Sequence, residues 1–347
     1  GTDGSVMIDL SSMEALRAAC TDFADGDAAA ADAARARQAE LVKPEGSLGR
    51  LEDIAVHMAR WQRTPRPRLA DARIIVFAGS HGVTRNGVSP FPDEVNAQML
   101  GGFRAGFAAI CQLAEAFGAR LEAIDCGVGE PTGDLASEPA MTEEGFLEAV
   151  RKGVDAVGGI EDILIFGDMG IGNTTAAAAV AAALFGGTGA DWAGRGAGLD
   201  ETGLARKAAV VDRSLAFHGD ALGDPLEALR RVGGREMAAI MGACLAARRH
   251  GVPVLLDGYI VCASVAPLRM LDPAGLDHAM AAHCSAEPGH RRVLERLELD
   301  PLLDLGMRLG EGSGAATALG LVRAALACHN GMATFAEAAV AGRKAEA

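Results

Sequence analysis

The sequence predicts an α/β fold in which helices cover both faces of a parallel sheet. Four short apolar segments end in Gly or Asp: RIIVFAG (73–79), RLEAIDCG (120–127), DILIFGD (162–168) and VPVLLDG (252–258). Apolar strands that alternate with helices are typical of sheets covered on both faces. Because right-handed crossovers bring the carboxyl ends of all strands to one edge, we expect ligands to bind at that edge.

Helical spacing of apolar residues separates these strands. It predicts helices over 93–117, 142–157, 173–185, 202–218 and 234–250. No internal repeat is evident.

Both ends of the chain also show helical patterns. Residues 1–64 are predicted to be helical, with a serine cap before MEALRAA, and so are the segments from about residue 300 on, including PLLDLGMRLG (301–310). The proline-rich stretch TPRPR (64–68) interrupts the first of these. We therefore predict a small helical domain of residues 1–66 and 300–347, and a large α/β domain of residues 67–299.

The composition is that of a folded protein with an acidic surface. Of the 347 residues, 50% are hydrophobic and 22% are charged, which is enough for a packed core. The net charge of −14 repels nucleic acid and acidic membranes. The apolar run AAAAVAAALFGG (176–187) is shorter than the roughly 20 residues that span a bilayer. We expect no nucleic-acid partner and no membrane partner.

The cysteine pattern favours a reducing compartment. The seven cysteines are scattered and form no CxxC pair, so neither a disulfide framework nor a zinc ribbon is indicated. The first residues lack the features of a secretory signal, which favours a cytoplasmic location. Without HExxH or paired histidines at helical spacing we expect no metal, and without GxSxG no serine hydrolase.

The glycine-rich loop FGDMGIGNTTAAAA (166–179) is the strongest local signal. It follows a strand, and its glycines, including Gly170 and Gly172, permit a tight turn and close approach of a ligand. Asn173, Thr174 and Thr175 are suited to capping the next helix, whose free N–H groups favour an anion. Either a plain helix cap or an anion or ribosyl site fits this pattern.

A second loop, GRGAGLDETGLARKA (194–208), combines glycines with two cations. Backbone amides beside Arg195 and Lys207 suit a phosphate, and Asp200 or Thr202 can cap a helix. The alternative is that Lys207 is an ordinary solvated residue.

A long loop, residues 77–95, leaves the first strand and has the length of a lid or substrate wall. His81 within it has no visible partner in the sequence, which favours a structural role over acid–base chemistry.

Glu311 lies among glycines and small residues in RLGEGSGAATALG (308–320). It is either the acidic residue that a helix N-terminus favours or a base aimed at a substrate. Burial raises the pKa of such a carboxyl and a helix N-terminus lowers it, so its strength as a base depends on which effect is larger.

Seven segments resemble, in order from residue 43 to 316, the nicotinate-nucleotide–dimethylbenzimidazole phosphoribosyltransferases of cobalamin biosynthesis. They are KPEGSLGRLEDIA, GSHGVTRNGVSPFPDEV, FGDMGIGNTTAAAA, GRGAGLDETGLARK, LDGYIVCASVAPL, HCSAEPGHRRVLERL and LLDLGMRLGEGSGAA. The resemblance implies a Rossmann-like parallel sheet, a small helical domain from both chain ends, a homodimer and no cofactor. It also implies transfer of 5-phosphoribose from nicotinate mononucleotide to a benzimidazole, giving α-ribazole 5′-phosphate and nicotinate.

The resemblance also assigns roles to residues. Glu311 matches the catalytic base, and Asp168 stands where the family has a second acid, a glutamate. The remaining substrate-binding residues that it implies are Ser80, Val88, Gly170, Gly172, Asn173, Thr174, Arg195, Gly196, Gly198, Lys207, Gly258, Ser285 and Leu309. Of these, residues 194–198, Lys207 and Gly258 match the phosphate pocket, and Leu309 and the 79–92 loop match the benzimidazole pocket.

Three alternatives remain open at this stage. The acceptor could be adenine or a phenol in place of dimethylbenzimidazole. GIGNTT with Asp191 at the distance of a ribose-binding acid resembles a dinucleotide site, which would make the protein an NAD-dependent oxidoreductase. A ribonucleotide-binding protein without catalytic activity would carry the same loops.

Overall fold

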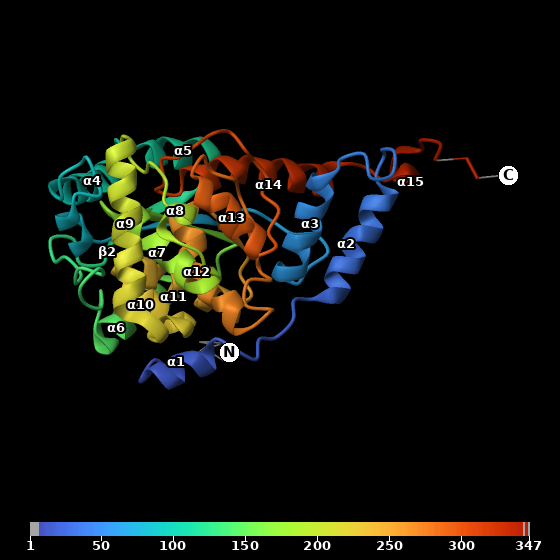
Figure 1. The fold of residues 1–347 in the computed structure, drawn as a ribbon. Helices are drawn as coiled ribbons and strands as arrows, with labels where there is room; N and C mark the ends of the chain where they lie inside the picture. Colours follow the sequence, from blue (N-terminus) through green and yellow to red (C-terminus); the bar gives the residue numbers. More distant parts are fainter. Residues whose placement is uncertain (1–6, 343, 346–347) are drawn as a thin grey trace.

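A five-stranded parallel sheet lies at the centre of the computed structural model, which describes residues 7–342, 344 and 345 (Figure 1). The strand order is β2-β1-β3-β4-β5, and each neighbouring pair is parallel. The strands are β1 (Ala72–Ala78), β2 (Arg120–Asp125), β3 (Ile163–Met169), β4 (Val254–Leu256) and β5 (Ala279–Ala281). The predicted α/β class is confirmed, as are the four strands expected from the sequence.

Helices surround this sheet. In chain order they are α1 (Met13–Ala19), α2 (Ala28–Glu40), α3 (Arg50–Gln62), α4 (Glu94–Ala105), α5 (Ala109–Phe117), α6 (Glu143–Ala156), α7 (Asn173–Phe185), α8 (Gly189–Trp192), α9 (Glu201–His218), α10 (Pro225–Val232), α11 (Arg235–His250), α12 (Tyr259–Leu271), α13 (Pro288–Arg296), α14 (Ser313–Gly331) and α15 (Phe335–Ala338), with short 3₁₀ turns η1 (Gly82–Asn86) and η2 (Gly219–Gly223). None of the helices in the described part of the chain is both long and apolar enough for a membrane span.

Alternation of side chains along the strands divides the core into two layers. Ile75, Phe77 and Phe166 point into one layer, which is filled by α6, α7, α11 and α12. Ile74 and Ile165 point into the other, which is filled by α3, α5 and α14. Because successive side chains of a strand point to opposite faces, strands covered on both sides read as continuous apolar runs.

The segments that follow α2 and precede α15 lie side by side at one side of the molecule (Figure 1). Leu41, after α2, forms an antiparallel bridge with Thr334, and the N–H of Val42 donates to the carbonyl oxygen of Ala333 at 3.0 Å. α3 and α14 also pack together against the sheet. The division into a small domain of residues 1–66 and 300–347 and a large domain of residues 67–299 stays a prediction.

The predicted helix over 93–117 is divided into α4 and α5. Gly106 adopts a left-handed φ of +90° after α4, and Phe107 and Ala108 turn the chain before α5 begins.

The predicted helix over 301–310 is wrong, because this segment runs extended beside the end of β5. The N–H groups of Leu302 and Leu303 donate to the carbonyl oxygens of Ala281 and Ala282, and the N–H of Ala286 donates to Met307. The sheet edge therefore satisfies backbone groups that a helix would otherwise pair internally. β5 itself was not predicted, since Ala-Met-Ala is too short to show a pattern.

Close packing of α6 on α11 rests on glycines. A Cβ atom added to Gly153 would lie 1.7 Å from the carbonyl oxygen of Ala239, which real contacts never permit. We expect Gly153→Ala to force the helices apart and to lower the free energy of unfolding by roughly 1–3 kcal/mol. Gly101→Ala is the control, because nothing lies within 4 Å of its added Cβ, and it should leave stability equal or higher. Urea unfolding of both variants measures this, and equal stability would contradict the packing argument.

Candidate active site

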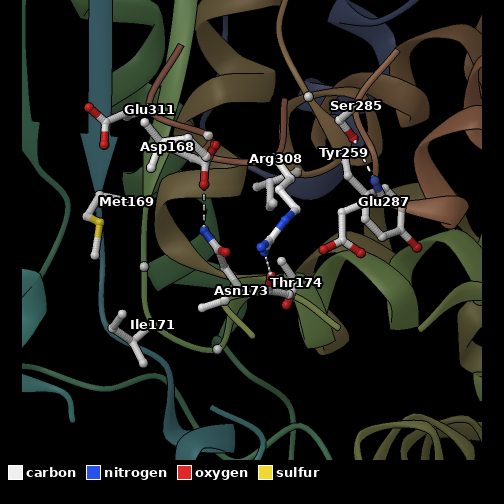
Figure 2. A pocket seen from close by; sticks show the side chains of 18 of the residues that line it. Asp168, Met169, Ile171, Asn173, Thr174, Tyr259, Ser285, Glu287, Arg308 and Glu311 are labelled. Carbon is white, nitrogen blue, oxygen red and sulfur yellow. Dashed lines mark hydrogen bonds between the residues drawn. The ribbon is translucent and has the colours of Figure 1, made fainter. Parts of the chain in front are cut away.

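A pocket opens at the carboxyl edge of the sheet, where the loops after β3, β4 and β5 meet (Figure 2). Its walls come from residues 168–174, 258–260, 308–311 and parts of the loops at 88–89, 196–197 and 283–287. Figure 2 shows the carboxylates of Asp168 and Glu311 at one end, and Ser285, Tyr259 and Glu287 at the other. The site therefore lies where parallel strand topology places it.

Glu311 sits in a left-handed turn that its neighbours make possible. Gly310, Glu311 and Gly312 have φ angles of +87°, +54° and +86°, and only glycine adopts this region freely. Ser313 stabilises the turn, since both its N–H and its hydroxyl donate to the carbonyl oxygen of Gly310, at 3.0 and 2.7 Å. Gly167 on β3 is also required, because a Cβ there would lie 2.5 Å from the carbonyl carbon and oxygen of Glu311.

The carboxylate of Glu311 is buried and points to the start of α5. It is 5% exposed, and its Oε2 accepts a hydrogen bond from the N–H of Ile110 at 3.1 Å. No side chain of its own segment caps α5, so Glu311 takes that role. Burial raises the pKa of Glu311, the Ile110 N–H opposes this, and Asp257 adds to it. Burial is the larger of the two expected effects, and the opposing N–H belongs to α5 instead of the helix that follows Glu311.

Asp168 occupies the end of β3 and is also buried. Its Oδ2 accepts a hydrogen bond from the side-chain amide of Asn173 at 2.9 Å. Burial, followed by the negative charge of Asp257, raises the pKa of Asp168 to about 7. This carboxyl therefore changes protonation near neutral pH, which makes it suited to acid–base or electrostatic work.

The N-terminus of α7 faces the pocket without a side-chain cap. Gly172 occupies the cap position with a φ of +89°. The prediction that Asn173, Thr174 and Thr175 cap this helix is wrong. The amide of Asn173 binds Asp168, the hydroxyl of Thr174 accepts from Lys207, and the buried hydroxyl of Thr175 has no hydrogen-bond partner among the described residues. Two N–H groups of the first turn, those of Asn173 and Thr175, donate to the carbonyl oxygens of Gly170 and Gly172 at 3.0 and 3.1 Å. The positive end of the α7 dipole still favours an anionic ligand there.

Lys207 on α9 lies directly behind this turn. Its side chain is 1% exposed, and its Nζ donates to the hydroxyl of Thr174 at 2.7 Å and to the carbonyl oxygen of Gly194 at 2.9 Å. The alternative of an ordinary solvated lysine is therefore wrong. Burial lowers the pKa of Lys207 to about 8, and the charge of Glu287 partly opposes that change. Both hydrogen-bond acceptors are neutral, so an anion bound at the turn would supply charge compensation.

The pocket brings together most of the residues predicted from the sequence. Those that line it are Val88, Asp168, Gly170, Gly172, Asn173, Thr174, Gly196, Gly258, Ser285, Leu309 and Glu311. Lys207 lies behind the lining and reaches it through Thr174.

Besides Lys207, three predicted residues lie outside the lining of the pocket. The hydroxyl of Ser80 is buried and accepts hydrogen bonds from the N–H of Gly129 at 3.0 Å and from the amide of Asn96 at 3.3 Å. Arg195 is exposed and donates to the carbonyl oxygen of Leu199, and Gly198 turns the same loop with a φ of +119°. The roles predicted for these three residues stay predictions.

Two further residues have structural surroundings. His81 is buried and its Nε2 lies 2.6 Å from Oε1 of Glu236, which agrees with the structural role favoured for it. Asp191 caps α8 through the N–H and hydroxyl of Thr188 and does not line the pocket. The dinucleotide interpretation requires Asp191 to contact the ligand, so the position of Asp191 argues against it.

Sequence reasoning did not assign several residues of the site. Tyr259, His283, Glu287 and Arg308 line the pocket. Asp257 lies behind it, where its two oxygens accept from the N–H groups of Gly312 and Ala315 at 3.0 Å each. The signal for Asp257 was an acid directly after a buried strand, the same signal that marked Asp168.

These features place two buried carboxyl groups beside a helix N-terminus, at the carboxyl edge of a parallel sheet. The chain matches the phosphoribosyltransferase family over residues 24–340, and it belongs to that family. It is 56% identical to the nicotinate-nucleotide–dimethylbenzimidazole phosphoribosyltransferase of Mesorhizobium japonicum, over 95% of this chain and 98% of that protein. The enzyme of the same name from Novosphingobium aromaticivorans is also 56% identical, with the same two coverages.

A solved structure agrees with these relatives. The crystal structure of the enzyme of this name from Thermus thermophilus is similar with a TM-score of 0.85 and 40% identity, over 91% of this chain and all of that one.

The raised pKa of Asp168 predicts a pH-dependent stability. Its pKa is about 7 in the folded protein and near 3.8 in an unfolded chain, so the folded state loses stability as the pH rises from 3.8 to about 7. Asp168→Asn removes this cost, and its amide oxygen can still accept from Asn173. As the pH rises from 5 to 8, the free energy of unfolding of the wild type should fall by roughly 1–3 kcal/mol relative to that of the variant. Urea unfolding at both pH values measures the difference, and parallel pH dependences would contradict the assignment.

Proposed function

We propose that this protein transfers 5-phosphoribose from nicotinate mononucleotide to 5,6-dimethylbenzimidazole, giving α-ribazole 5′-phosphate and nicotinate in cobalamin biosynthesis. The observation that carries the proposal is the buried carboxylate of Glu311, held by a left-handed turn in a pocket that also contains an uncapped helix N-terminus backed by Lys207. The names of the relatives give the same reaction class.

The phosphate of the nucleotide binds at the start of α7. The N-terminal end of α7, the hydroxyl of Thr174 and the glycine loop at 196 surround this position, with Lys207 behind it. The phosphate is remote from the bond that breaks, so its binding energy serves to position the ribose. On a chain with net charge −14, these groups supply the local attraction that the overall field does not.

The acceptor base binds beside Glu311. Val88, Met169, Ile171 and Leu309 give the pocket apolar walls. Figure 2 shows Met169 and Ile171 on the same side as Glu311, and the glycines around Glu311 carry no side chains that would block a flat bicyclic ring. One ring nitrogen attacks C1′ while the other loses its proton to the carboxylate. The raised pKa of Glu311 makes it a stronger proton acceptor than an exposed glutamate.

Nicotinate can leave without protonation by the enzyme. The pyridinium nitrogen of nicotinate mononucleotide is already positive, and departure of nicotinate neutralises it. Positive charge that develops at C1′ is stabilised by the acidic end of the pocket, where Asp168 lies in addition to Glu311. Asp168 is one methylene shorter than the family's glutamate, so it reaches less far into the pocket.

The homodimeric state implied by the resemblance and the cytoplasmic location favoured by the cysteine pattern also remain proposals for this chain.

The decisive experiment incubates the protein with nicotinate mononucleotide and a panel of benzimidazoles, purines and phenols, and identifies products by mass. We expect α-ribazole 5′-phosphate and nicotinate from dimethylbenzimidazole. Glu311→Gln should keep its fold and lose about 100-fold or more in turnover, the range of general base catalysis. Nucleotide binding without product from any acceptor would support a non-catalytic binding protein, and a rate close to the wild type in Glu311→Gln would remove Glu311 as the base.

Replacing Lys207 should change the KM for nicotinate mononucleotide more than kcat. Lys207→Met keeps the buried volume and removes the charge, so the KM for nicotinate mononucleotide should rise about 10-fold or more while kcat changes little. In the wild type this KM should rise as the pH passes about 8, where Lys207 loses its proton, and in the variant it should not. Lys152→Met, at an exposed lysine that donates to the carbonyl oxygen of Asp125, is the control. An unchanged KM would place the phosphate elsewhere.

A further inference from the structure

Asp257 makes contacts that the proposed chemistry does not use. It follows β4, is 1% exposed and does not line the pocket. Its Oδ2 accepts from the N–H of Gly312 and its Oδ1 from the N–H of Ala315, both at 3.0 Å. Gly312 directly follows Glu311, and Ala315 lies in the first turn of α14. One carboxylate therefore binds both the last residue of the left-handed turn and the helix that follows it.

We infer that Asp257 is a positioning residue, which holds the turn at Gly310–Gly312 and thereby aims the carboxylate of Glu311 at the acceptor base. The inference rests on the proposed function, since it concerns the base of that reaction. It adds a residue that touches neither substrate and acts on the base through the turn that carries it.

The geometry requires a carboxylate at this position. The two N–H donors reach different oxygens of the same side chain, and an amide or hydroxyl offers only one accepting atom. The turn also needs an outside support, because Glu311 has a side chain and a φ of +54°, where side chains are strained. Without Asp257, the turn is free to relax toward ordinary angles, which would move the carboxylate of Glu311.

The charges around Asp257 give the inference a second readout. The Nε2 atom of His283 lies 3.6 Å from Oδ1 of Asp257. Glu311 faces Asp257 from the turn before α14, and Asp168 faces it from β3. On α12, the thiol of Cys262 contacts the backbone carbonyl oxygen of Asp257. Burial raises the pKa of Asp257 and His283 opposes this. The charge of Asp257 in turn raises the pKa of Glu311. Removing that charge should therefore shift the acidic limb of the rate profile to lower pH.

The test compares Asp257→Asn and Asp257→Glu in the wild-type and Glu311→Gln backgrounds. With Glu311 present, both substitutions should lower kcat about 10-fold or more, with the KM for nicotinate mononucleotide within about twofold. In the Glu311→Gln background Asp257→Glu should cost less than about twofold, because it keeps the charge that acts on Asp168 and the base that it positions is already lost. The acidic limb should move to lower pH in Asp257→Asn and stay in place in Asp257→Glu.

Asp272→Asn is the matched control. Asp272 also accepts backbone N–H groups, those of Asp22 and Ala274, and it lies at the far end of α12. It should leave kcat unchanged in both backgrounds. Should Asp257→Asn fail to fold by circular dichroism, Asp257→Glu carries the comparison, because it keeps the buried charge beside His283.

Equal losses in both backgrounds would overturn the inference and leave Asp257 a structural residue, as would a wild-type kcat in a folded variant. Absence of product from the wild-type protein would instead refute the proposed function, so the two failures are distinguishable.

Discussion

Two backbone hydrogen bonds to the carboxylate of Asp257 join the carboxyl edge of the sheet to the start of α14. α14 also fills one face of the sheet with Ala315, Leu319 and Val322, so a single helix contributes to the core and fixes the position of Glu311. Because the helix is held by both its apolar face and its N-terminal N–H groups, the site cannot shift without disturbing the core. The rest of the pocket is arranged around this fixed point.

Charged groups lie at several places along the pocket. Figure 2 shows Asp168 and Glu311 at one end and Glu287 at the other. Lys207 lies behind the start of α7, where it and the positive end of the helix dipole favour a phosphate. The low dielectric of the buried walls strengthens this interaction.

The sequence predicted most of this arrangement because the signals were local. Apolar runs that end in Gly or Asp located four strands, and glycine-rich loops after them located Gly170, Gly172 and Thr174 in the pocket. What could not be predicted depends on contacts between distant segments. The extended path of 301–310 is set by the edge of β5, the carboxylate of Glu311 meets α5 instead of its own helix, and Asn173 binds Asp168 instead of capping α7. Burial of Lys207 is likewise visible only once α9 is packed behind α7.

The hydrogen bond from the N–H of Ile110 to Glu311 links the protonation state of this carboxyl to the N-terminus of α5. While Glu311 is ionised, its Oε2 is a charged acceptor for the first turn of α5. In the proposed reaction the carboxylate takes a proton from the acceptor base, becomes neutral and holds that hydrogen bond less strongly. α5 packs against the edge strand β2, so this proton transfer would weaken one contact of a helix at the edge of the sheet. The proposed chemistry at Glu311 therefore reaches α5, although none of the residues of α5 lines the pocket.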